Sequence, residues 1–355
     1  MLNIGRDSLW KPVTKLIEQE LNIPAKNVLM NASHSHSAPA VEWNYSTVAS
    51  YLEILIPETA EIAREAIANL APAQMKMART NTQDLGYVRR YLRYDGQWAT
   101  DTSIAGGTAM KGMLDPTVYY HESDPDTQMQ ILVFDRESDK DIALCNWQCH
   151  VTAVGSATGT DVSSDFVGVF RDTVEEELGV HCAYFQGAAG SIVPSGKLEG
   201  EAQNHEDYVK HGQDLANTMI AAMDNLTPIS AGKIEASYLL HKGTIKEEAI
   251  EDYGETYNVR IATYSFGEFS IAAVPLEMDH RNGMAVKAAS PYTMTFMCGY
   301  SNGGHGYLPA ASSYPNGAYE VNSTRFVAGT GENIAEDLVD MLDELHLERK
   351  APNVY

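Results

Sequence analysis

Two histidines one residue apart, His34 and His36, stand in the segment NASHSHSAPA, directly after a short apolar run. Side chains two positions apart in an extended chain point to the same face. Both imidazoles could therefore reach one metal ion, and imidazole nitrogen is a common zinc ligand. Two ordinary loop or core histidines would give the same pattern. The pair alone leaves a metal site and a structural role both open.

Two further ligand types stand at the ends of apolar strands. His150 closes the segment DIALCNWQCH, and Glu277 follows the apolar run FSIAAVPL. In open α/β sheets, sites form outside the carboxyl ends of strands, and this would bring both residues toward the histidine pair. Each also has a plainer interpretation. His150 could be a buried histidine with a backbone hydrogen bond, and Glu277 could belong to the first turn of a helix.

Hydrophobic periodicity predicts the elements that must position these residues. Helical spacing favours helices at 9–21, 46–70, 165–178, 205–226, 280–289 and 331–347. Apolar or alternating runs favour strands at 27–33, 73–80, 129–136, 141–150, 182–187, 232–240, 257–265, 268–274 and 293–298. This alternation indicates an α/β fold of mixed, layered sheets flanked by helices, with the metal site at the C-terminal ends of strands.

Some local features refine this expectation. Pro57 is expected to break or restart its helix, and Asp165 is expected to cap the helix that follows it rather than to bind metal. Residues 81–128 are rich in Gly, Asp, Tyr and Thr, and they predict long ordered loops around short strands. No linker or repeat divides the chain, so residues 1–355 are expected to form a single catalytic domain.

The composition argues against several partners and locations. A formal charge of −23, from 48 acidic and 25 basic residues, repels phosphate groups, so nucleic acid and anionic membrane surfaces are not expected partners. No apolar stretch predicts a transmembrane helix, and the start MLNIGRDSLWKPVTKL does not resemble a signal peptide. The four cysteines form no disulfide framework or C-x-x-C pair. A cytoplasmic location is expected.

Several other catalytic patterns are missing. The sequence has no G-x-S-x-G nucleophile elbow, no Walker loop and no G-x-G-x-x-G segment. The metallo-β-lactamase pattern needs an aspartate where Ala38 stands. The amidohydrolase barrels also carry H-x-H, but they need a (β/α)₈ repeat that the predicted elements do not form.

Taken in chain order, several segments resemble the neutral/alkaline (non-lysosomal) ceramidase family and its shorter bacterial relatives. NASHSHSAPA is similar to the family's Thr-His-Thr-His-Ser-Gly-Pro motif, and CNWQCHVTAVG (145–155) to the segment that bears its second metal histidine. The other matching segments are YVRRYLRYDG (87–96), SSDFVG (163–168), YFQGAAGSIVP (184–194), VPLEMDHRNG (274–283), GYSNGGHGYLP (299–309) and GAYEV (317–321). No single motif is specific, but the ordered set is.

The resemblance implies one Zn²⁺ per chain, held by His34, His150, Glu277 and Tyr307. It also implies a polar rim of His36, Arg89 and Tyr319, in which His36 handles a proton and Arg89 or Tyr319 stabilises an oxyanion. Alternatives remain for the rim: Arg90 could take the place of Arg89, Arg89 could form a surface salt bridge, and Tyr319 could be a cross-strand aromatic.

This resemblance implies a zinc-dependent hydrolase in which a metal-activated water attacks an amide (N-acyl) carbonyl. The expected partner is a small-molecule or lipid-like amide. The turn departs from the family pattern, because Val193 stands where a serine precedes the proline and Ser191 stands in place of an asparagine. The chain is also expected to lack the family's opening strands and its C-terminal β-sandwich domain.

Those departures leave the substrate open between ceramide, another amide, and a lactone or polar, sugar-like molecule. A non-catalytic binding protein that kept the fold is the contrasting class. Another divalent metal at the same ligands is also compatible with a mixed nitrogen and oxygen set.

Overall fold

Two mixed sheets form the centre of the fold in the computed structural model, which describes residues 7–39, 41, 46–100, 118–154, 162–194, 205–304 and 306–350. The first sheet has the order β10-β1-β6-β7-β8 and the second β11-β12-β13-β15. The strands of the first are β1 (Ala73–Asn81), β6 (Gln128–Arg136), β7 (Ile142–Trp147), β8 (His181–Gln186) and β10 (Thr227–Ile229). Those of the second are β11 (Ile234–Thr244), β12 (Thr256–Phe266), β13 (Phe269–Ala273) and β15 (Met294–Cys298).

Each of these sheets contains one parallel pair of neighbouring strands. In the first sheet β7 runs parallel to β8, and in the second β13 runs parallel to β15; the remaining pairings are antiparallel. Strands of a parallel pair end at the same edge of the sheet. The two pairs therefore each offer one edge where loops from separate parts of the sequence meet.

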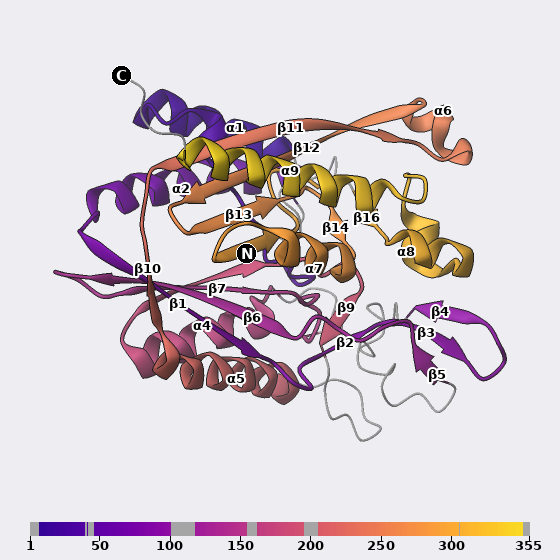
Figure 1. Ribbon diagram of the computed structural model, residues 1–355, viewed down its shortest axis with the longest axis horizontal. Coiled ribbons are helices and arrows are strands. Elements are labelled where there is room, and N and C mark those ends of the chain that lie inside the picture. The colour runs from indigo at the N-terminus through magenta and orange to yellow at the C-terminus, as the bar shows by residue number, and fades with distance from the viewer. Residues whose placement is uncertain are drawn as a thin grey trace.

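The central strands bury side chains on both of their faces, which produces a four-layer sandwich. In β6, Ile131 and Val133 pack toward helices on the outer side of the first sheet, whereas Leu132 packs against the second sheet. Helices α4 (Asp165–Leu178) and α5 (His205–Ala222) form the outer layer on the first sheet, and Figure 1 shows them along its lower side. Helices α7 (His280–Ala289) and α9 (Thr330–Lys350) cover the second sheet. The predicted layered α/β fold is confirmed.

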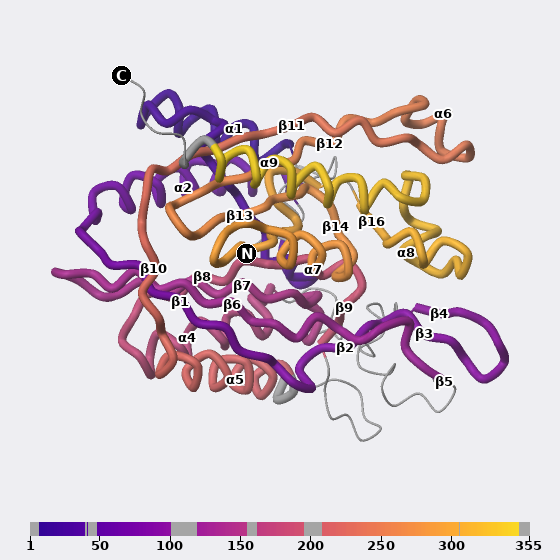
Figure 2. The backbone as a smooth tube through the Cα atoms, in the orientation of Figure 1, coloured from indigo at the N-terminus to yellow at the C-terminus, as the bar shows by residue number. Residues whose placement is uncertain are grey.

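Shorter elements complete the fold around these layers, and Figure 2 follows the backbone through them. Two small strand pairs lie near the parallel strand ends: β2 (Gly86–Val88) with β9 (Ile192–Pro194), and β14 (Glu277–Met278) with β16 (Tyr307–Leu308). A three-stranded sheet of β3 (Arg90–Arg93), β4 (Trp98–Thr100) and β5 (Val118–His121) projects from the body. The remaining helices are α1 (Asp7–Leu21), η1 (Ala25–Asn27), α2 (Ser46–Ala68), η3 (Met223–Asn225), η4 (Glu247–Ala249), α6 (Ile250–Tyr253), η5 (Ala311–Asn316) and α8 (Ala318–Ser323).

The strand predicted at 27–33 is wrong. This segment makes only an isolated bridge, between Asn31 and Ser301, and its anchor is a side chain: Asn31 Nδ2 donates to the carbonyls of Gln186 (3.2 Å) and Gly299 (2.7 Å). An amide that bonds two backbone carbonyls can replace a strand ladder. The segment is thereby tied to the ends of β8 and β15.

Two other local predictions have mixed outcomes. Pro57 does not break its helix, and α2 continues through it. Proline has no N–H to donate to the Glu53 carbonyl, but Glu53 is exposed, so water can bond this carbonyl instead. Asp165 is not the N-cap of α4 but its first residue, and the N-cap Ser164 makes no side-chain cap hydrogen bond. The Asp165 carboxylate accepts from the backbone N–H of Phe166 (2.6 Å) and from that of Val154, outside the helix (2.8 Å). Short strands occur within 81–128 as predicted, although 101–117 lie outside the described residues.

The single-domain organisation stays a prediction. Within the described parts of the chain, no helix combines the length and apolar character needed to cross a bilayer.

The contact between the two sheets can be tested at Leu132, whose side chain is fully buried. We expect Leu132→Ala to lower the free energy of unfolding by about 2–5 kcal/mol, because it leaves a cavity between the sheets. Leu70→Ala removes the same atoms from a side chain that is 79% exposed, and we expect it to change stability by no more than about 0.5 kcal/mol. Urea unfolding followed by circular dichroism measures both; equal losses would contradict the four-layer packing.

Candidate metal centre

The predicted site residues stand at the carboxyl ends of the two parallel strand pairs. His150 lies shortly after β7, and a tight turn at 187–192 follows β8. Glu277 follows β13, and Tyr300 follows β15. The edge that parallel topology makes available therefore carries side chains from four strand ends.

The histidine pair reaches this edge from the N-terminal part of the chain. Ser35 forms a parallel bridge with Val151, and the backbone N–H of His36 donates to the Val151 carbonyl at 3.1 Å. On the other side, the N–H of Ala32 donates to the Tyr300 carbonyl at 3.2 Å. The segment is thus fixed between the two sheets, with His34 buried.

Two imidazole nitrogens converge on one carboxylate oxygen. His34 Nε2 lies 3.3 Å from Glu277 Oε2, and His150 Nε2 lies 3.2 Å from the same oxygen. Zinc–ligand bonds of about 2.0–2.2 Å in tetrahedral geometry set neighbouring ligand atoms about 3.3–3.6 Å apart. The spacing and chemistry of this donor set therefore fit zinc.

His36 offers a second grouping. Its Nε2 lies 3.1 Å from His34 Nε2, and ligand atoms of His34, His36 and His150 all lie within 4.8 Å of one another. A three-histidine site and a two-histidine, one-glutamate site are both found among catalytic zinc centres. His34 and His150 belong to both sets, and His36 and Glu277 distinguish them.

The ring of His150 is oriented by the turn that follows β8. Its Nδ1 donates to the carbonyls of Ala189 (2.7 Å) and Ile192 (3.0 Å), because a carbonyl oxygen can only accept. Burial, followed by the charge of Arg89, lowers the pKa of His150 to about 4. The imidazole is therefore neutral near pH 7, with Nε2 directed at Glu277, which is the state a metal ligand needs. The backbone hydrogen bond expected of a buried structural histidine is therefore present, and it also holds the His150 ring in the orientation that a metal ligand needs.

Glu277 is ionised in the interior. Burial alone would raise its pKa, but the adjacent His34 and His150 hold that pKa well below the usual range. A buried carboxylate without a counter-charge is strongly unfavourable. With its hydrogen on Nδ1, His150 cannot donate to this carboxylate through Nε2, so a cation between His150 Nε2 and Glu277 Oε2 would satisfy both atoms.

Tyr300 is a site residue that the sequence pattern did not identify. Its ring stacks on that of His34 with centroids 4.2 Å apart, and its hydroxyl donates to Glu277 Oε2 at 3.4 Å. His34 and Tyr300 both adopt positive φ, at 64° and 51°. Such backbone is uncommon outside glycine and recurs at functional sites. The sequence signal for Tyr300 was its position in the Gly-rich segment 299–309, but the same segment contains Tyr307, and the pattern does not distinguish the two tyrosines.

Tyr307 lies directly beside Glu277, because the two residues are register partners in the parallel pair of β14 and β16. Its ring centroid is 5.3 Å from that of Tyr319. Tyr319 belongs to helix α8, so the cross-strand alternative for it is wrong. With 40% of its surface exposed, Tyr319 stands at the solvent side of this tyrosine pair.

Arg89 and Arg90 are fully buried, so the surface salt bridge considered for Arg89 is wrong. One carboxylate joins them: Glu320 Oε1 accepts from Arg89 Nε at 2.7 Å, and Glu320 Oε2 accepts from Arg90 Nη1 at 2.9 Å. Only the Arg89 guanidinium lies by the tyrosines, 5.4 Å from the centroid of Tyr307 and 5.7 Å from that of Tyr319.

Arg90 instead turns toward Glu122, with Nε donating to Oε2 at 2.8 Å. The two adjacent arginines thus separate into one that faces the site and one that anchors the framework. Of the two alternatives in the sequence, Arg89 is the one in contact with the predicted site tyrosines.

His36 forms the open side of the cluster, since it is exposed whereas His34 and His150 are buried. Its pKa nevertheless lies well below the usual histidine value, because nearby groups desolvate the ring and because His34 and His150 disfavour its charge. The neutral ring can accept a proton at the boundary with solvent, and the imidazolium that forms can release it.

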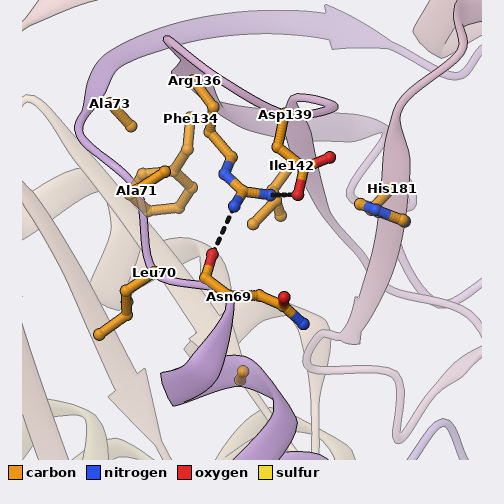
Figure 3. A pocket seen from close by; sticks show the side chains of 10 residues that line it. Asn69, Leu70, Ala71, Ala73, Phe134, Arg136, Asp139, Ile142 and His181 are labelled. Carbon is orange, nitrogen blue, oxygen red and sulfur yellow. Dashed lines mark hydrogen bonds and ion pairs between the residues drawn. The ribbon is translucent and has the colours of Figure 1, made fainter.

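A surface pocket of about 470 Å³ lies elsewhere, among residues at the end of β6 and the starts of β7 and β8 (Figure 3). The Arg136 guanidinium in this pocket already has partners within the protein, because it donates to the Asn69 carbonyl and pairs with Asp139. This pocket is at the opposite ends of the strands from the metal centre, and it brings together none of the predicted site residues.

Comparisons with known proteins agree with this architecture. Neither a protein-family model nor a curated protein sequence matches the chain. Among solved structures, neutral ceramidase from Pseudomonas aeruginosa matches with a TM-score of 0.77 and 16% identity, over 99% of this chain and 66% of that one. A ceramidase complexed with C2 matches with a TM-score of 0.76 and 15% identity, over 99% of this chain and 68% of that one. The chain has a neutral ceramidase-like fold and spans about two thirds of the length of these neighbours.

The carboxylate shared by the buried arginines gives a test of how the site is held. We expect Glu320→Gln to lower the free energy of unfolding by about 3–5 kcal/mol, because it leaves buried guanidinium charge uncompensated. Glu61→Gln, which removes an exposed partner of Arg64, should cost no more than about 1 kcal/mol. Urea unfolding provides the comparison, and a Glu320→Gln loss no larger than that of Glu61→Gln would contradict a structural role for this pair.

Proposed function

We propose that this chain is a zinc-dependent hydrolase of the neutral ceramidase type, which cleaves an amide (N-acyl) bond. The observation that carries the proposal is the convergence of His34 Nε2 and His150 Nε2 on Glu277 Oε2, at 3.3 and 3.2 Å. The neutral ceramidase-like fold supports the choice of reaction. The ligands proposed for Zn²⁺ are His34, His150, Glu277 and Tyr307.

When bound, zinc supplies Lewis acidity to a carbonyl oxygen and to the attacking water. The protein supplies the remaining functions. His34 and Glu277 are buried, and the Nδ1 contacts of His150 with two carbonyls prevent that ring from turning. Rigid ligands of this kind hold the reacting groups in place without reorganisation during the reaction.

The open side of the site is proposed to carry the proton transfer and the oxyanion contacts. His36 is neutral and exposed beside the ligands, so it can take a proton from the attacking water and pass it to the leaving amine. Arg89 and Tyr319 face the same region, and their N–H and O–H groups can donate to an oxygen on which negative charge develops. No protein nucleophile is needed, and the position of the family serine is taken by the buried Val193.

The substrate class is proposed as a small-molecule or lipid-like amide. A lactone or polar, sugar-like substrate is the second candidate, because two polar aromatic side chains border this side: His36 is exposed and Tyr319 is 40% exposed. Parallel assays with a short-chain ceramide, small N-acyl amides and lactones separate these classes; turnover of ceramide alone would exclude the polar substrate.

Metal content gives the first test of the proposed centre. We expect about one zinc per chain in freshly purified protein by elemental analysis, and His150→Ala should reduce it to a small fraction. His211→Ala removes another buried histidine, from α5, and should keep the metal. Substoichiometric zinc that does not change in His34→Ala would instead favour a non-catalytic binding protein. Manganese or iron in place of zinc would revise the metal alone.

The separate role of His36 gives the second test. We expect His36→Ala to keep its zinc but to lower kcat for amide hydrolysis by about 10²–10⁴-fold, because the proton-transfer group is lost. Ser37→Ala, one position further along the same segment, should leave kcat within a few-fold of the original. Loss of zinc from His36→Ala would overturn this assignment and favour the three-histidine ligand set.

A further inference from the structure

The turn after β8 serves the site almost entirely through its backbone. Ala189 and Ile192 offer carbonyls to His150 Nδ1, at 2.7 and 3.0 Å. Between them, the Gly190 carbonyl accepts from Arg89 Nη2 at 3.0 Å, and the Ser191 carbonyl accepts from the Arg89 backbone N–H at 2.9 Å. Four successive carbonyls thus orient a proposed ligand and a rim residue, so a shift of this turn would move both.

The same turn is pressed against the strand that carries Glu277. The Gly190 N–H donates to the Met278 carbonyl at 2.8 Å. A Cβ on Gly190 would lie only 2.3 Å from the Glu277 carbonyl oxygen, so no other residue fits there without a shift. The position of His150 and that of Glu277 are therefore coupled through this contact.

One buried side-chain contact anchors the turn to helix α7. Ser191 Oγ lies 2.7 Å from His280 Nδ1, and the two residues are 1% and 0% exposed. His280 is three residues after Glu277 in the chain. The contact therefore joins the turn that orients one proposed ligand to the segment that contains another.

The surroundings of His280 define the direction of this hydrogen bond. Its Nε2 lies 3.0 Å from the Asp124 carbonyl and 3.1 Å from Ser123 Oγ. A carbonyl can only accept, so Nε2 carries the hydrogen, and in the neutral ring Nδ1 accepts from the Ser191 hydroxyl. Asp279 Oδ1 lies 3.4 Å from the same Nδ1, and the Asp279 carboxylate also accepts from Arg281 at 2.8 and 2.9 Å. The ring is thus held at both nitrogens.

We propose that Ser191 and His280 are positioning residues of the metal centre, a proposal that rests on the proposed zinc site. Their hydrogen bond fixes the turn at 187–192, and the turn fixes His150 Nε2 toward Glu277 Oε2. Ser191 stands where the ceramidase-like turn has an asparagine. Partners that orient metal ligands commonly contribute 10–100-fold to metal affinity or activity.

The zinc dissociation constant of the full chain, measured by competition with a chelator, tests this proposal. We expect Ser191→Ala to weaken zinc binding by about 10–100-fold. The matched control is Ser270→Ala, because Ser270 is also fully buried and makes one side-chain hydrogen bond, to Thr295 Oγ1 at 2.8 Å in the second sheet. Both variants lose a buried hydroxyl, and thermal unfolding compares their stabilities, but only Ser191→Ala should change zinc affinity.

Two substitutions of His280 keep the test valid if Ser191→Ala does not fold. In His280→Asn the side-chain oxygen takes the position of Nδ1 and can accept the Ser191 hydroxyl, so zinc affinity should stay within about 3-fold of the original. His280→Gln places its amide near Nε2 instead and should weaken binding like Ser191→Ala. Equal zinc affinity in His280→Asn and His280→Gln, or in Ser191→Ala and Ser270→Ala, would overturn the positioning role. Absence of zinc from the unsubstituted protein would overturn the proposed function itself, together with this inference.

Discussion

The site depends on one constraint: Glu277 carries its charge in the interior, and every group around it must compensate for that charge. His34, His150 and Tyr300 all direct a polar atom at the same oxygen, Oε2. Isolated buried carboxylates are too unfavourable to persist, so such a group marks a place where a positive partner is built in or bound. A zinc ion would satisfy the carboxylate and the two imidazole nitrogens together, which no single side chain of the cluster does.

The rest of the fold holds these groups in place. The two parallel strand pairs end at one edge, and the segments that follow them carry His150, Glu277 and Tyr300. Around this edge the charges are balanced locally, because Glu320 pairs with both Arg89 and Arg90 and Glu122 pairs with Arg90 as well. Removing a partner from such a pair is costly, so the framework resists the displacements that would separate the ligands. Precise placement of a few groups is what metal-dependent hydrolysis requires.

Much of this arrangement could be predicted from the sequence, and the parts that could not have a common cause. Strand periodicity placed His150 and Glu277 at strand ends. The ordered motifs added Tyr307, which the fold places beside Glu277, and Arg89 and Tyr319, which it places beside Tyr307. The strand at 27–33 was wrong because a side chain, Asn31, replaces its ladder through partners more than 150 residues away. Local patterns also could not show the burial of Arg89 or the contacts of Tyr300, since their partners are distant in the sequence. The predicted ligand set itself stays a prediction.

X-ray absorption at the zinc edge of the metal-loaded protein tests the central claim most directly. Two imidazoles and oxygen ligands at bond lengths of about 2.0–2.2 Å, with no sulfur, are the result expected for a centre of His34, His150, Glu277 and Tyr307. In Glu277→Gln the spectrum should change in its oxygen contribution and keep the two imidazoles. A first shell with three imidazoles, or with a sulfur from one of the four cysteines, would contradict this account of the site.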